Sequence, residues 1–223
     1  NDKNPIGIFH INASTLGIEI KYNKKIFNFI RHNIKKDFIF IIVSVIHSKG
    51  LHANILIIDN IYKTIELFEP HGSSGRYYND IDIHKKFKSF FLKEFSKEVS
   101  LKYEYYSPID YQNINDFQNI ESHSLYVYKN FNEVFGFCLA WVFWYLEHRI
   151  INKNVKNYIL IKKLRNKIIK DKFEIHDIIR SYGQKLKNYN SDSYKRHDLN
   201  TYHGDIQEEN ILNLIDDIKK IQT

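Results

Sequence analysis

Hydrophobic and polar positions in the first half of the chain follow strand-like patterns. The run from Phe38 to Ile46 is continuous, apolar and rich in β-branched residues, which is typical of a strand buried on both faces. Leu51 to Asp59 and Lys63 to Glu69 have a similar composition and are joined by a short polar link. The pattern predicts a hairpin beside the first strand, and therefore three consecutive strands at the centre of a sheet.

Apolar residues at helical spacing predict helices in the rest of the chain. One amphipathic helix is predicted from Ile83 to Phe95. The sequence FCLAWVFWYLEHRI, from Phe137, is apolar nearly all round and predicts a buried central helix that begins at Cys138. Further helical patterns cover 158–170, 173–187 and 206–221, with a polar loop over 188–204.

The remaining segments carry weaker patterns. Residues 1–37 form a lead-in with a helix or strands, 101–106 form a further strand, and 110–132 form a long loop. We find no internal repeat. The sequence therefore predicts a single domain over 1–223 of the α+β class, with a central mixed or antiparallel sheet and a buried helix that bears the cysteine.

Composition changes this picture little. The 223 residues are 43% hydrophobic and 15% aromatic, which is enough to build a full core. The sequence has no apolar run of about 18 residues and no signal-peptide pattern, so we expect no membrane partner and an intracellular protein. The net charge of +7 indicates an acidic partner, with weak nucleic-acid contact as one form, but the lysines are spread along the chain.

Cys138 is the single cysteine, so it cannot form an internal disulfide. Free cysteines are most often buried for packing alone. A helix N-terminus, however, lowers the pKa of a thiol, because the macrodipole and the unpaired N–H groups favour the thiolate. A nucleophilic cysteine also needs a histidine, and an acid or amide that orients the histidine.

The predicted hairpin supplies both partners. His52 lies near the start of one strand and Glu69 at the end of the next, so an antiparallel pairing places them at the same edge of the sheet. Asp59 and Glu66 are alternatives to Glu69, although alternation places Glu66 on the opposite face. We therefore predict Cys138 as nucleophile, His52 as base and Glu69 as the orienting residue.

Other chemistry finds little support in the sequence. His47, His71 and His84 lack the tight spacing of zinc ligands, and we interpret them as structural or exposed residues. No phosphate-binding or dinucleotide motif is present. We expect no metal and no cofactor.

Two motifs resemble the ubiquitin-like proteases, the group that includes the adenovirus-type proteases. LHANILIIDNIYKTIELFEP is similar to their histidine-containing hairpin, and GFCLAWVFWYLEHRI is similar to their cysteine helix. The resemblance is closest to members from large DNA viruses, through Glu69-Pro70-His71-Gly72 and Gly136 to Trp141. It covers about a third of the chain. Ala53 stands where the family often has Trp, and Phe137 and Leu139 depart from its usual Asp-Cys-Gly.

The resemblance implies a papain-like fold (clan CE) and a thiol protease that cleaves peptide or isopeptide bonds. Either maturation of viral structural proteins or removal of ubiquitin or SUMO-like modifiers fits, in the host cytoplasm or a virion. It also implies an oxyanion-hole glutamine, for which Gln118 is the candidate and Asn132 the alternative; losing such a donor costs about 10²- to 10³-fold in rate. The alternative function is an inactive, basic, nucleic-acid-associated or structural protein with the same fold.

Overall fold

The computed structural model describes residues 7–14, 17–47, 50–73, 80–99, 102–113, 116–120, 137–171 and 177–184. Its strands are β1 (Ile8–Ser14), β2 (Gly17–Tyr22), β3 (Phe38–His47), β4 (Gly50–Asp59), β5 (Thr64–Phe68) and β6 (Glu104–Tyr106). Its helices are α1 (Lys25–Asn33), α2 (Asp80–Glu98), α3 (Pro108–Tyr111), α5 (Cys138–Ile151) and α6 (Asn157–Lys170), and residues 117–120 and 177–184 are also helical.

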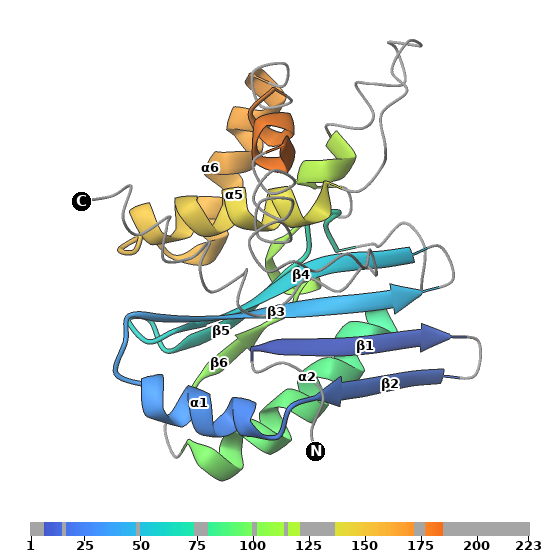
Figure 1. Ribbon diagram of the computed structural model, residues 1–223. Coiled ribbons are helices and arrows are strands. Elements are labelled where there is room, and N and C mark those ends of the chain that lie inside the picture. Colours follow the sequence, from blue (N-terminus) through green and yellow to red (C-terminus); the bar gives the residue numbers. More distant parts are fainter. Residues whose placement is uncertain are drawn as a thin grey trace, which may run out of the picture.

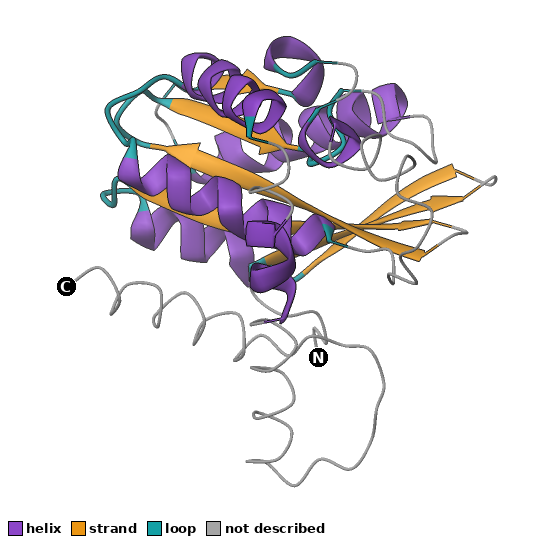
Figure 2. Cartoon of the chain, turned by 90° about the horizontal axis from the view of Figure 1, so that it is seen from above, coloured by secondary structure: helices purple, strands orange, loops and turns teal. Residues whose placement is uncertain are grey.

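The strands form one mixed six-stranded sheet in the order β2-β1-β3-β4-β5-β6. The pairs β1–β2, β3–β4 and β4–β5 are antiparallel, whereas β1–β3 and β5–β6 are parallel. Parallel neighbours need a crossover, and the chain makes these two crossovers through α1 and α2. The view from above shows the pronounced twist of the sheet (Figure 2).

Each face of the sheet carries its own hydrophobic core. Helices α1 and α2 cover one face, and α5 and α6 lie on the other (Figure 1). Alternation along β4 divides its side chains between the two cores: Leu56 and Ile58 pack with α1 and α2, whereas Ile55 and Ile57 pack with α5. The central strands are thus buried on both faces, which explains their continuous apolar sequence.

The predicted central strands, the amphipathic helix α2 and the start of the buried helix at Cys138 are confirmed. The lead-in contains β1, β2 and α1. The prediction of one loop over 110–132 is wrong, because α3 extends to Tyr111 and a helical turn covers 117–120. The helix predicted over 206–221 and the loop over 188–204 lie outside the described residues.

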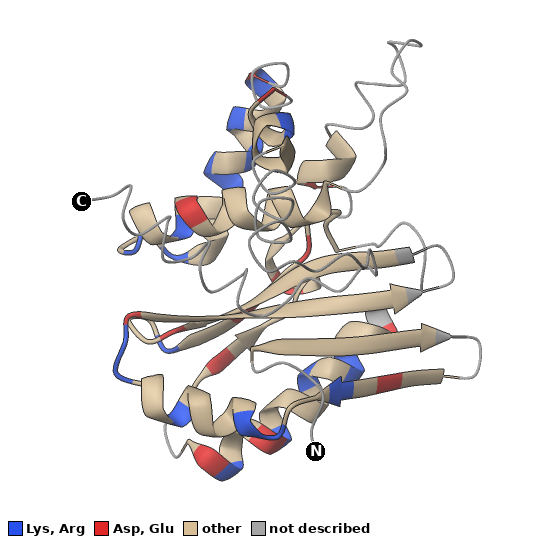
Figure 3. Cartoon of the chain, in the orientation of Figure 1, with Lys and Arg blue, Asp and Glu red and all other residues tan. Residues whose placement is uncertain are grey.

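Charged residues gather on the helices rather than on the central strands (Figure 3). Helix α6 has five Lys or Arg residues and no acidic one in its sequence NYILIKKLRNKIIK. Within the described part of the chain, no helix has the length and apolar character needed to cross a membrane.

Candidate thiol site

The β4–β5 hairpin places His52 and Glu69 at one end of the sheet. Strand β5 pairs with only the second half of β4, and its last pair joins Phe68 to Ile55. Strand β4 therefore extends beyond β5, and His52 lies in that extension while Glu69 directly follows β5. The antiparallel geometry predicted from the sequence is confirmed, and it brings the two side chains into contact.

Helix α5 brings the thiol to this end of the sheet. Cys138 is the first residue of α5, and the backbone N–H of Ala53, next to His52, donates to its Sγ at 3.4 Å. The helix is held against the sheet by apolar side chains all along its length, including the fully buried Trp141 and Tyr145. A thiolate at Sγ thus has one backbone donor and lies at the positive end of a helix.

His52 and Glu69 form a buried pair. His52 is 6% exposed and Glu69 is fully buried, and His52 Nε2 lies 2.5 Å from Glu69 Oε1. Burial alone would raise the pKa of Glu69, but the positive charge and hydrogen bond of His52 lower that pKa to about 2. Burial likewise opposes protonation of His52, yet the Glu69 charge and the nearby Cys138 raise the pKa of His52 well above its ordinary value.

Cys138 is the third member of the site and interacts with His52. Burial by itself raises the pKa of Cys138, but a hydrogen bond with His52 and the charge of that ring bring the pKa below its ordinary value. Since Glu69 engages Nε2, Nδ1 is the ring nitrogen left to face the thiol. The arrangement favours a thiolate beside an imidazolium, which is the reactive form of a cysteine.

The loop after β5 is held by the segment that follows α3. The side-chain amide of Gln112 contacts the Glu69 backbone with both ends: its Oε1 accepts from the N–H at 3.0 Å, and its Nε2 donates to the carbonyl at 2.8 Å. Further along, the N–H of Asp116 donates to His71 O at 3.0 Å, and the N–H of Gln118 donates to Pro70 O at 2.9 Å. Glu69 is thus positioned through its main chain as well as its side chain.

These contacts also place the predicted amide donors. Gln118 lies beside the loop that follows Glu69, through its backbone bond to Pro70. Asn132 lies outside the described residues. The structure thus brings Cys138, His52 and Glu69 together and places the Gln118 backbone close to this group, while the chemical roles predicted for all four residues remain predictions.

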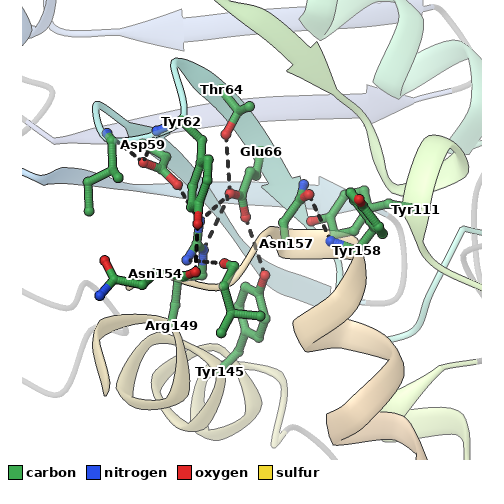
Figure 4. A network of polar contacts seen from close by, with 12 residues as sticks. Asp59, Tyr62, Thr64, Glu66, Tyr111, Tyr145, Arg149, Asn154, Asn157 and Tyr158 are labelled. Carbon is green, nitrogen blue, oxygen red and sulfur yellow. Dashed lines mark hydrogen bonds and ion pairs between the residues drawn. The ribbon is translucent and has the colours of Figure 1, made fainter. Parts of the chain in front are cut away.

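A second polar network fastens the far end of α5 to the same hairpin (Figure 4). Fully buried Arg149 pairs with Asp59 of β4 and, at 3.0 Å, with Glu66 Oε1 of β5. Tyr145 OH donates to Glu66 Oε2 at 3.3 Å. Asp59 and Glu66, the two alternatives to Glu69, therefore hold the helix, and Glu66 points to the face of the sheet that α5 covers.

Two histidines beside the site were missed as functional candidates. The His71 ring stacks on His52 with 4.8 Å between ring centroids, and His84 of α2 is 3% exposed. Both lie close enough to Glu69 for their charges to interact with its carboxylate. The described residues include no group of three or more His, Cys, Asp or Glu that could hold a metal ion. The sequence feature that could have indicated a role for His71 is its position two residues after Glu69, the predicted orienting residue.

Comparison with known proteins finds a similar sequence in a giant virus. A protein of Acanthamoeba polyphaga mimivirus, named as an ankyrin repeat protein, is 33% identical over 159 residues, which is 68% of this chain and 20% of the relative. The chain thus spans about a fifth of the relative's length. No family model matches the chain, and no solved structure matches it.

These findings contradict the resemblance to the ubiquitin-like proteases. The relative bears the name of an ankyrin repeat protein, not of a protease, and no protease family matches. The assignment to that group is therefore wrong by this comparison, and peptide or isopeptide hydrolysis, deubiquitination and the inactive-protease alternative fall with it. The two motifs cover too little of the chain to carry a family, although their local geometry is as the hairpin and helix patterns predicted.

The observed fold also differs from an ankyrin repeat, the class named in the relative. An ankyrin repeat is a β-turn with two helices, repeated about every 33 residues. The described residues instead form a six-stranded mixed sheet with helices on both faces, an α+β arrangement. Since no solved structure matches, the predicted papain-like topology remains a prediction.

Proposed function

We propose that this chain is a protein-binding domain whose chemical centre is an activated thiol. The observation that carries the proposal is the buried contact of Glu69 with His52 and of His52 with Cys138, which brings together the end of β5, strand β4 and the start of α5. A cysteine kept only for packing would have apolar neighbours and a raised pKa. Cys138 instead has an imidazole, a backbone N–H and a helix N-terminus around its sulfur.

The reactivity of the site depends on whether Cys138 or His52 holds the thiol proton. The thiol proton moves to Nδ1 of His52, and the imidazolium is stabilised by the Glu69 carboxylate at Nε2. The sulfur is then a thiolate that can attack an electrophilic carbon or sulfur atom. With iodoacetamide, for example, the S–C bond forms as iodide leaves.

Two observations support a protein as the partner. The relative is named for ankyrin repeats, and stacked repeats of this kind form extended binding surfaces. In the chain itself, Ile46 and Leu51 face each other across β3 and β4, next to the pair Val45 and His52. They are 39% and 58% exposed, so an apolar pair lies at the surface within one residue of the thiol site.

The thiol is tested by following thiolate absorbance and iodoacetamide alkylation of the full chain across pH 5 to 10. Because Cys138 is the single cysteine, the signal belongs to one group. We expect His52→Ala to slow alkylation at pH 6 by at least about tenfold, since each pKa unit changes the thiolate fraction about tenfold. His32→Ala is the matched control, because His32 is exposed on α1. An ordinary cysteine titration in the unmodified chain would refute the proposal.

Protein binding is tested by purifying a protein captured on the immobilised chain and titrating it by calorimetry. We expect saturable binding that Leu51→Asp weakens at least about tenfold, because a charge there disrupts an apolar contact. Alkylation of Cys138 should be unchanged in the same variant. Failure to find any protein that binds more tightly than about 100 µM would count against this half of the proposal.

A further inference from the structure

His71 lies directly against the imidazole of His52. The two rings stack with centroids 4.8 Å apart and planes 28° from parallel, and His71 is 7% exposed. His71 comes from the turn after β5, two residues beyond Glu69. One ring face of His52 is therefore covered by a second imidazole rather than by an aliphatic side chain.

Asn119 holds the His71 ring and determines its tautomer. Asn119 Nδ2 donates to the carbonyl oxygen of His71 at 2.8 Å, which identifies the nitrogen end of the amide because a carbonyl can only accept. The other end, Oδ1, lies 3.0 Å from His71 Nδ1. An amide oxygen only accepts, so Nδ1 must carry a proton. The Asn119 side chain thus hydrogen-bonds to both the ring and the backbone of His71.

The backbone of His71 also positions Glu69. Its N–H donates to Glu69 Oε1 at 3.0 Å, and the same oxygen receives His52 Nε2. His71 therefore touches both members of the buried pair, one through its ring and the other through its main chain. The carbonyl of His71 is in turn fixed by the N–H of Asp116 as well as by Asn119.

We propose that His71, gripped by Asn119, is a positioning residue that sets the ring plane of His52 and so aims Nδ1 at the Cys138 sulfur. This inference rests on the proposed function of the thiol. The ring of His52 could otherwise pivot about its bond to Glu69, and a pivot would move Nδ1 away from the sulfur. Stacking on His71 prevents this rotation of the His52 ring. The two contacts from Asn119 keep the His71 ring itself in place. In metal sites, removing a partner that orients a ligand histidine costs about 10- to 100-fold in affinity or activity, and the same positioning argument applies to a histidine that must face a thiol.

Three variants of the full chain test the proposal. Asn119→Ala releases the His71 ring, His71→Ala removes the stacked face, and His71→Phe restores a ring face without the Nδ1 donor. We expect the first two to slow alkylation of Cys138 at pH 6 about tenfold, and His71→Phe to recover part of the His71→Ala loss. Nitrogen-15 shifts of His52 should show a smaller proton share at Nδ1 in the slowed variants.

The controls separate this inference from a general loss of stability and from the proposed function. Thermal unfolding and far-UV circular dichroism identify any variant that fails to fold, and His71→Phe, which keeps the ring volume, provides a test if His71→Ala does not fold. Wild-type alkylation rates in Asn119→Ala and His71→Ala, or in Asn119→Ala alone if His71→Ala does not fold, together with a strong loss in His52→Ala, would overturn the positioning role and leave the activated thiol standing. An ordinary thiol titration in the wild type would instead remove the proposed function itself.

Discussion

Replacing Arg149 with methionine should strongly destabilise the protein. The guanidinium is fully buried, pairs with Asp59 and Glu66, donates to Val155 O at 3.1 Å, and lies 4.9 Å from the centre of the Phe38 ring. Methionine fills a similar volume, but it leaves two carboxyl groups in the core without their cation. The change therefore tests electrostatics with little change in packing.

The magnitude follows from the burial of the two acids. Removing one partner of a buried ion pair costs about 3 to 5 kcal/mol, because the remaining charge is uncompensated. The total free energy of unfolding of a domain is about 5 to 15 kcal/mol, so Arg149→Met should remove a large part of it. Burial already raises the pKa of Glu66 in spite of Arg149. Removing the cation raises it further, so the loss should shrink as the pH falls and the acid takes up a proton.

Urea unfolding followed by circular dichroism at pH 7 and pH 5 measures both effects. The triple variant Arg149→Met, Asp59→Asn and Glu66→Gln removes all three charges, and we expect it to recover much of the stability lost in Arg149→Met. A loss below about 1 kcal/mol in Arg149→Met, or an equal loss at both pH values, would refute the account of a buried cation that compensates two acids.

Two further outcomes follow from the site. The folded pKa of Glu69, about 2, lies below its ordinary value, so this residue stabilises the fold above about pH 5, and that stability is lost as the pH falls toward 2. Urea unfolding from pH 7 to pH 2.5 should show a smaller acid loss in Glu69→Gln, by on the order of 3 kcal/mol; equal slopes for both proteins would contradict the pairing with His52. Gly183→Ala should lower the melting temperature and change the alkylation rate of Cys138, because the added Cβ would lie 2.7 Å from the ring of Phe137, the residue before the thiol. An unchanged melting temperature, measured by calorimetry against Ser181→Ala, would show that the ring moves aside freely.

The local pattern of the sequence was enough to place the centre of the sheet and the start of α5. The run from Phe38 is apolar because β3 is buried on both faces, and the antiparallel hairpin follows from two strands separated by a short link. The same pattern says nothing about how distant strands pair. The parallel pairing of β1 with β3 depends on a crossover through α1, and no residue in the short apolar pieces of 1–37 specifies that partner.

The site was predicted in its chemistry but not in its surroundings. His52 and Glu69 could be paired from register alone, since their strands run antiparallel. His71 could not be assigned a role, because Pro70-His71-Gly72 is typical of a turn and turn residues are usually exposed. Asn119 lies in a segment predicted as loop, where a short helical turn instead carries it to the ring. The sequence predicts an apolar helix around Arg149 but not its buried partners, because Asp59 and Glu66 reach it only through tertiary contacts.

The division of the sheet into two cores has a consequence for how the protein comes to be folded. The core beneath α1 and α2 is built wholly from residues between Phe9 and Tyr105, whereas the core on the other face needs α5 and α6. During synthesis the first half emerges first, so we expect the sheet with one covered face to form before the cysteine helix is available. Until α5 docks, His52 and Glu69 lie at the end of a sheet that has no helix on this face. Rapid alkylation of Cys138 would therefore show that α5 has docked on the sheet.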